Sequence, residues 1–184
     1  MLLTYFPIIV SLFAIAFVYF SIAKIRKAPV AKDKAIAITE AIQEGAISYL
    51  KRQYKSVGIV IVVLFFIIWI FFGQQSGFSA GFKMAFGFLI GAVLSGASGF
   101  IGMLVSTQTN TRVAEAAKKG LAQALDLSFR GGLVTGLLVV SLGLLAVSGY
   151  YFLTGIEGLI ALGFGASLIS VFARIGGGIY TKAA

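Results

Sequence analysis

Five long apolar stretches decide what this chain can fold into. They cover about residues 2–23, 57–74, 82–107, 131–153 and 159–182. An α-helix of about 20 residues crosses the roughly 30 Å hydrocarbon layer of a bilayer. Because lipid offers no hydrogen-bond partners, each apolar segment must satisfy its own backbone groups, and a helix does so. The sequence therefore predicts an all-α membrane protein with five transmembrane helices.

The composition supports this class and narrows the chemistry. Of the 184 residues, 59% are hydrophobic and 11% charged, whereas a soluble domain carries about 25% charged residues. The absence of Cys and His excludes disulfides, thiol nucleophiles and Cys/His metal sites. Magnesium prefers clustered oxygen ligands. The acidic residues are scattered: Asp33, Glu40, Glu44, Glu115, Asp126 and Glu157. We therefore expect no metal site and no catalytic residue within this chain.

The basic residues predict the orientation in the membrane. The formal net charge is +9, and most of the positive charge lies in two polar connectors. The connector after the first stretch holds Lys24, Arg26, Lys27, Lys32, Lys34, Lys51, Arg52 and Lys55, and the one after the third holds Arg112, Lys118, Lys119 and Arg130. The two opposite loops hold only Lys83. Since cytoplasmic loops are enriched in Lys and Arg, we expect the N-terminus outside and both connectors and the C-terminus inside. Charge placed beside membrane segments argues against a nucleic-acid partner.

The connectors themselves are expected to be helical. Pro29 breaks the first one, and residues 33–54 then show helical spacing that continues into the second stretch. Residues 110–130 form the second connector, while 73–81 and 155–158 read as turns. Because the basic residues follow the first stretch rather than precede it, an uncleaved helix is favoured over a signal peptide.

Small residues recur every four positions along the third stretch. Gly87, Gly91, Ser95 and Gly99 lie on one helix face. In a membrane such a face lets another helix approach closely. We expect this stripe to serve packing rather than chemistry.

The fifth stretch carries the candidate site residues. Arg174 lies about 22 Å along a helix that begins near Leu159, at the cytoplasmic edge of the hydrocarbon layer. Ser167 precedes Arg174 by seven residues and shares its side of the helix, and Lys182 follows in the cytosol. In a purely structural interpretation, Arg174 and Lys182 only anchor the helix end at the lipid headgroups. The three glycines at 176–178 instead favour close approach of a helix or a ligand.

Several segments resemble the membrane-integral pyrophosphatases, which couple pyrophosphate hydrolysis to proton or sodium pumping. The segments are AIQEGAISYLKRQYK (41–55), GAVLSGASGFIGMLVSTQTNTRVAEAAKKG (91–120), ALDLSFRGGLVTGLLVVSLGLL (124–145) and GFGASLISVFARIGGGIYTKAA (163–184). They cover most of the chain in the order found in the family. The last is the most specific.

The resemblance implies a larger assembly. Members of the family are single chains of about sixteen transmembrane helices. Two such chains form a homodimer in the cell inner or plasma membrane. The five stretches match the first five helices, and the fifth belongs to an inner ring. By motif position, Arg174 matches an arginine of the ion gate, with Ser167 on the same face, and Lys182 matches a lysine that contacts pyrophosphate. Magnesium is the implied cofactor, whereas the sequence leaves open whether potassium stimulates and whether the pumped ion is H+ or Na+.

One departure from the family pattern shapes the functional hypothesis. In the family, an acidic motif that binds magnesium follows the equivalent of Ala184, and it is absent from this sequence. We therefore interpret residues 1–184 as one transmembrane region, the N-terminal fragment of a pump, and expect it to be inactive alone. Two alternatives are a small polytopic assembly protein and an anion-transporter subunit without hydrolytic activity.

Overall fold

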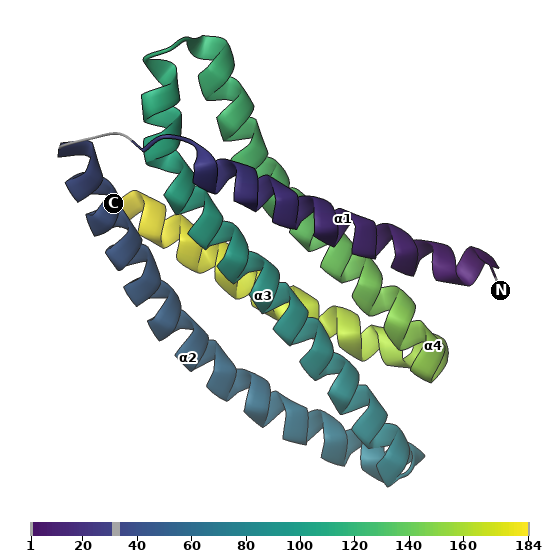
Figure 1. Cartoon of the computed structure of the whole chain (residues 1–184). Coiled ribbons are helices and arrows are strands. Elements are labelled where there is room, and N and C mark those ends of the chain that lie inside the picture. Colours follow the sequence, from purple (N-terminus) through teal and green to yellow (C-terminus); the bar gives the residue numbers. More distant parts are fainter. Residues whose placement is uncertain (1, 31–33, 184) are drawn as a thin grey trace.

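Long helices joined by short turns make up the described chain (Figure 1). The structure is a computed structural model that describes residues 2–30 and 34–183, with side chains described for 5–30 and 36–173. Its elements there are α1 Leu2–Lys27, α2 Lys34–Ser76, α3 Phe78–Ala117 and α4 Leu121–Ala183. All four are long and apolar enough to cross a membrane. The predicted all-α class is confirmed.

The fourth and fifth predicted stretches both lie in α4, folded back on each other. As one straight helix its 63 residues would extend about 95 Å, far more than a bilayer. At Gly155 the backbone takes φ 68° and ψ −156°, a region open essentially to glycine alone. This residue divides α4 into a first segment, 121–154, and a second segment, 156–183. Ala146 and Tyr150 of the first pack against Leu162 of the second, so the two run antiparallel.

Two helices are longer than a membrane requires. α2 has 43 residues and α3 has 40, or about 64 and 60 Å. As predicted, the helix of the first polar connector continues into the second apolar stretch, and Gly58 does not interrupt it. α3 continues to Ala117, so the second connector is helical except for a turn that ends at Gly120, where φ is 139°.

The turn between α2 and α3 is tighter than the sequence suggests. The expected loop over residues 73–81 narrows to Gly77, which has φ 92°. The helices on either side meet through glycine: a Cβ on Gly81 would lie 2.6 Å from the Trp69 carbonyl oxygen. The Trp69 ring closes the turn against Phe78 and Phe82, with ring centroids 4.8 and 5.3 Å away.

The small-residue stripe of α3 packs against the second segment of α4, as predicted. A Cβ on Gly91 would overlap the Leu162 carbonyl. Ser95 donates a hydrogen bond to the Ala166 carbonyl at 3.0 Å, four residues further along both helices. Gly165 approaches α3 in return, and a Cβ there would overlap a backbone carbonyl of that helix. The two helices therefore run parallel with backbone against backbone.

The ends of the stripe have other partners. Gly87 also accommodates the Tyr150 ring, because a Cβ would lie 2.6 Å from its Cε1. Gly99 faces α2, where the Tyr54 hydroxyl would lie 3.4 Å from such a Cβ. The stripe thus serves two neighbouring elements rather than the one that its spacing suggests.

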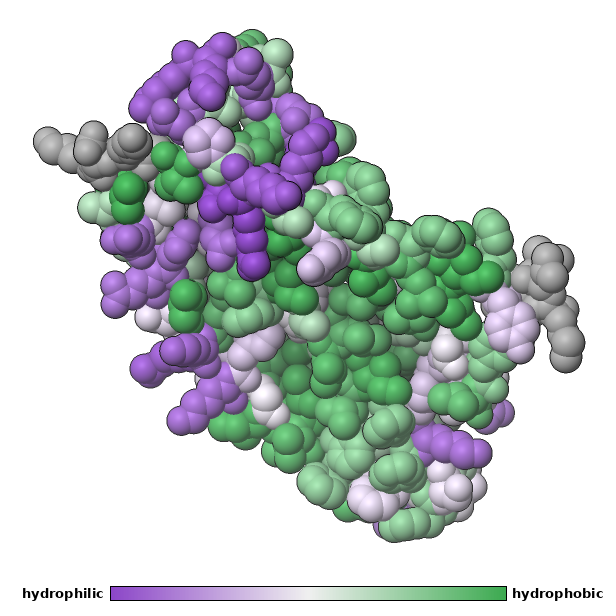
Figure 2. Space-filling view, viewed as in Figure 1, coloured by the Kyte–Doolittle hydropathy of each residue, from purple (hydrophilic) through white to green (hydrophobic). Residues whose placement is uncertain are grey.

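α1 packs against the first segment of α4. Together with Val105 of α3 they form a cluster of buried residues: Val18 and Ile25 from α1, and Leu127, Val134 and Leu138 from α4. The Tyr5 ring stacks on that of Phe152 at the other end, with centroids 5.4 Å apart. Many large apolar side chains are exposed on the outer surface and are not buried between helices (Figure 2). Such an outer surface suits lipid, where apolar residues need no burial against protein.

Candidate functional site

The predicted site residues all belong to the second segment of α4. Ser167 is exposed on this segment. The helix continues through Ala183, past the glycines at 176–178. Arg174 and Lys182 lie in 174–184, outside the residues whose side chains are described. The shared helical face of Ser167 and Arg174 stays a prediction from their seven-residue spacing.

A groove of about 350 Å³ lies beside Ser167, between α3 and the two segments of α4. Four serine side chains line it: Ser95, Ser98, Ser167 and Ser170. The hydroxyl groups of Ser95 and Ser98 donate to carbonyls of Ala166 and Ser95, at 3.0 and 2.8 Å. Those of Ser167 and Ser170 make no hydrogen bond to another described residue. They leave two hydroxyl groups without a described partner in a groove that is otherwise lined mainly by apolar side chains.

Two neighbouring residues of α2 donate hydrogen bonds to backbone carbonyls of other helices, one in α4 and one in α3. The Gln53 side-chain amide donates to the Phe172 carbonyl at 2.6 Å, and the Tyr54 hydroxyl donates to the Gly96 carbonyl at 2.7 Å. Burial raises the pKa of Tyr54, and the nearby Tyr49 adds to this, so its hydroxyl stays a donor at neutral pH.

Sequence reasoning did not single out this pair. Their only signal is that two long polar side chains stand where the apolar stretch of α2 begins. The partners are backbone carbonyls of other helices, which no residue pattern identifies. Gln53 acts as a positioning residue for the segment of α4 that carries Arg174, whereas Tyr54 holds α2 against α3.

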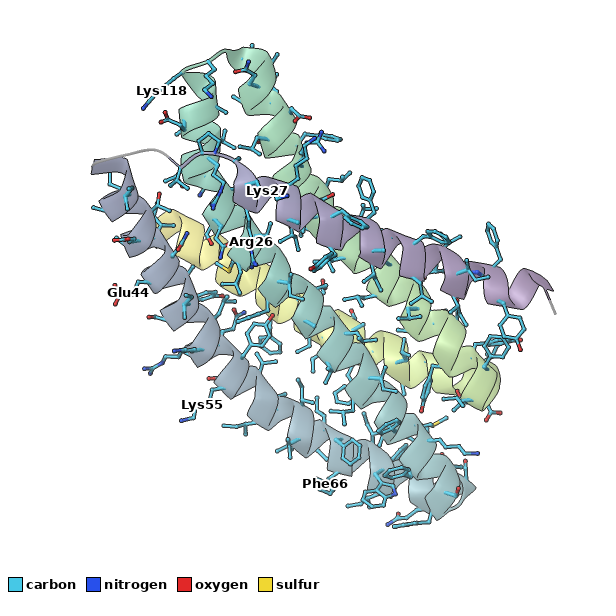
Figure 3. All side chains as sticks on the ribbon, viewed as in Figure 1. Arg26, Lys27, Glu44, Lys55, Phe66 and Lys118 are labelled. Carbon is cyan, nitrogen blue, oxygen red and sulfur yellow. The ribbon has the colours of Figure 1, made fainter. Side chains whose placement is uncertain are left out.

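Positive charge gathers at one end of the molecule. The end of α1, the start of α2 and the α3–α4 turn lie together there (Figure 1), and hydrophilic side chains concentrate over them (Figure 2). Arg26, Lys27 and Lys118 lie at this end (Figure 3). Arg130 donates a hydrogen bond to the Asp126 carboxylate at 2.9 Å, which holds the pKa of that carboxyl below its usual range. Both polar connectors therefore contribute to one cationic end.

No group of three Asp or Glu residues that could hold a metal ion occurs in the described part of the chain. Glu40 and Glu44 belong to α2, whereas Glu115 and Asp126 flank the turn between α3 and α4. Glu157 follows Gly155 at the opposite end. The arrangement can attract anions to its cationic end.

The sequence is similar to a known protein family over most of its length. The family described as inorganic H+ pyrophosphatase matches residues 12–184. A K(+)-insensitive pyrophosphate-energized proton pump of Methanosarcina mazei is 45% identical over 94% of this chain and 25% of its own length. A putative K(+)-stimulated pyrophosphate-energized sodium pump of Bacteroides thetaiotaomicron is 38% identical over 96% of this chain and 26% of its own length. The chain thus spans about a quarter of the length of these relatives.

The similarity extends over both polar connectors and all five apolar segments, including the second segment of α4 with Ser167, Arg174 and Lys182. The relatives include potassium-insensitive and potassium-stimulated pumps. The predicted resemblance is confirmed, and the chain belongs to the inorganic H+ pyrophosphatase family of membrane-bound, pyrophosphate-hydrolysing ion pumps.

Proposed function

We propose that this chain is the N-terminal part of a pump that couples hydrolysis of inorganic pyrophosphate to translocation of H+ or Na+ out of the cytosol. The observation that carries this proposal is the family match over residues 12–184. The relatives are about four times as long as this chain. The complete protein therefore has a bundle of about sixteen helices, most of which lie in the rest of its chain. It forms a homodimer.

In this proposal five helices cross the cell inner or plasma membrane, with the N-terminus outside and the C-terminus in the cytosol. The gathering of both polar connectors at one end supports this orientation, because cytoplasmic loops carry the excess of Lys and Arg. The turns at Gly77 and Gly155 then face the outside.

Three residues of the second segment of α4 receive roles. Lys182 contacts a phosphate group of pyrophosphate, and Arg174, with Ser167 on the same face, belongs to the path of the pumped ion. A charge-assisted hydrogen bond from Lys182 would offset part of the substrate's negative charge. The magnesium ligands and the residues that activate water lie beyond residue 184, and potassium dependence is set outside this chain.

The test starts from the DNA that follows the Ala184 codon. We expect an open reading frame that continues into an acidic, glycine-containing motif. The complete protein in inverted membrane vesicles should hydrolyse pyrophosphate with magnesium and transport H+ or Na+ into the lumen. Residues 1–184 alone, in the same vesicles, should not. A native stop codon after Ala184, or turnover by residues 1–184 above a blank, would overturn the proposal.

A further inference from the structure

A polar cavity of about 460 Å³ lies where the end of α1, the start of α2 and the end of α3 meet. It is separate from the groove beside Ser167 and from the second segment of α4. Its polar lining consists of Arg26 from α1, Thr39, Glu40 and Gln43 from α2, and Gln108, Thr111 and Arg112 from α3. Three elements therefore contribute to one polar chamber.

Arg112 has unused hydrogen-bonding capacity in this cavity. Its Nη1 donates to the Gln108 carbonyl at 2.5 Å. Its Nε is buried and has no acceptor among the residues that the structure describes. A guanidinium group carries five N–H donors, and a planar oxyanion acceptor matches two of them at once. The terminal N–H groups of Arg112, rather than its buried Nε, are the donors that line the cavity and can serve an acceptor there.

The carboxylate in the cavity does not supply that acceptor. Glu40 forms no ion pair within 4.0 Å with Arg26 or Arg112 in the described chain, where the ion pairs are Lys118–Glu115 and Arg130–Asp126. Two guanidinium groups and one carboxylate leave the described lining with a net positive charge. The cavity therefore favours an anion.

Its position selects the kind of anion. Arg26 follows the apolar part of α1, and Gln108 follows that of α3, so the cavity lies at the level where the apolar helices end. In a bilayer this is the level of the phosphate headgroups. Val30 and Ile36 complete the lining, and both are exposed large apolar residues. A molecule that combines a phosphate with apolar chains fits both surfaces.

We propose that this cavity binds a phosphodiester, the headgroup of an anionic phospholipid, through donors of Arg112 and Arg26. Basic pockets between membrane helices are suited to such headgroups. Amide and hydroxyl groups of Gln43, Gln108 and Thr39 offer partners for a hydroxylated headgroup such as glycerol. The inference rests on the proposed placement of these helices in a bilayer and is independent of pyrophosphate hydrolysis.

Native mass spectrometry of the complete protein in a mild detergent tests this site. We would titrate phosphatidylglycerol and phosphatidylcholine with identical acyl chains against wild type, Arg112→Gln, Arg26→Gln and Lys119→Gln. Lys119 is exposed at the same end but outside the cavity, so it matches the loss of charge. Wild type should prefer phosphatidylglycerol, and each arginine variant should bind it about tenfold more weakly, the loss of one charge-assisted hydrogen bond.

Arg26 is exposed, so Arg26→Gln should keep its fold and decide the test even if Arg112→Gln does not. Equal weakening by Lys119→Gln would reduce the effect to general attraction at the surface and overturn the proposal. A second titration adds inorganic phosphate to the lipid-bound protein. Displacement of the lipid at millimolar phosphate, with the same dependence on Arg26 and Arg112, would assign the cavity to a soluble anion and overturn the lipid assignment.

Discussion

Single atoms decide how closely α3 and the second segment of α4 can approach. Gly165 lies where any Cβ would overlap α3, whereas Gly163, two residues earlier on the same helix, has nothing within 4 Å of such a Cβ. The two glycines therefore have different tasks although they share a helix and a composition. Only contacts in three dimensions separate them.

Gly165→Ala should destabilise the chain by about 1–3 kcal/mol, the usual cost of forcing an extra carbon into a tight interface. Gly163→Ala is the matched control and should leave stability unchanged or raise it by up to about 1 kcal/mol, because alanine favours a helix. Thermal unfolding in detergent measures both. Equal stability of the two variants would contradict the close approach of these helices.

A second prediction at this scale concerns the hydroxyl of Tyr54. Tyr54→Phe removes its 2.7 Å hydrogen bond to the Gly96 carbonyl and should cost about 0.5–1.5 kcal/mol of stability. Tyr151→Phe is the control, because Tyr151 is 45% exposed and donates no hydrogen bond within the described residues. Chemical unfolding in mixed micelles compares the two. If both variants unfold at the same denaturant concentration, the hydrogen bond of Tyr54 does not contribute to stability and the prediction is wrong.

At the scale of elements, one glycine decides how α4 is folded. Apart from Gly155 the backbone is helical from residue 121 to 183, and without the break the two segments would not meet. Val139 and Val171 stand on the two segments 32 positions apart, which would be about 48 Å in an unbroken helix. The hairpin instead brings Val139 and Ser170, the residue before Val171, to the same groove.

Gly155→Ala should therefore destabilise the hairpin by about 1–3 kcal/mol, since φ 68° with ψ −156° strains any residue with a side chain. Gly149→Ala, in open space within the same helix, should be neutral or stabilising. Spin labels at residues 139 and 171 report the fold directly. A wild-type separation near 48 Å would show a straight helix and contradict the hairpin.

At the scale of the whole molecule, the sequence predicts the fold more completely than it predicts the contacts that build the site. The apolar stretches, the break at Pro29 and the helical connectors follow from composition and periodicity, which act locally. The tight turn at Gly77 and the contact from Gln53 to Phe172 do not. Each depends on where another helix places its backbone, and a carbonyl leaves no mark in the sequence. Arg174 and Lys182 remain predictions from the family motif.

Orientation is the prediction that belongs to the whole bundle. The chain has no native cysteine, so single substitutions report one position each. In intact cells a membrane-impermeant maleimide should label Gln75→Cys, beside the Gly77 turn. It should label Ser128→Cys, in the second polar connector, only after permeabilisation. Labelling of Ser128→Cys in intact cells would reverse the proposed topology.

The roles proposed for Lys182 in hydrolysis and for Arg174 in ion transfer can be measured separately. The most direct measurement follows pyrophosphate hydrolysis and ion transport side by side, in vesicles that contain the complete protein. Lys182→Ala should lower hydrolysis by about ten- to a hundredfold through loss of a charge-assisted contact. Arg174→Lys should impair transport although the charge remains, because Lys lacks the planar fork of Arg. Normal transport by Arg174→Lys together with normal hydrolysis by Lys182→Ala would make both residues topological anchors and contradict the account.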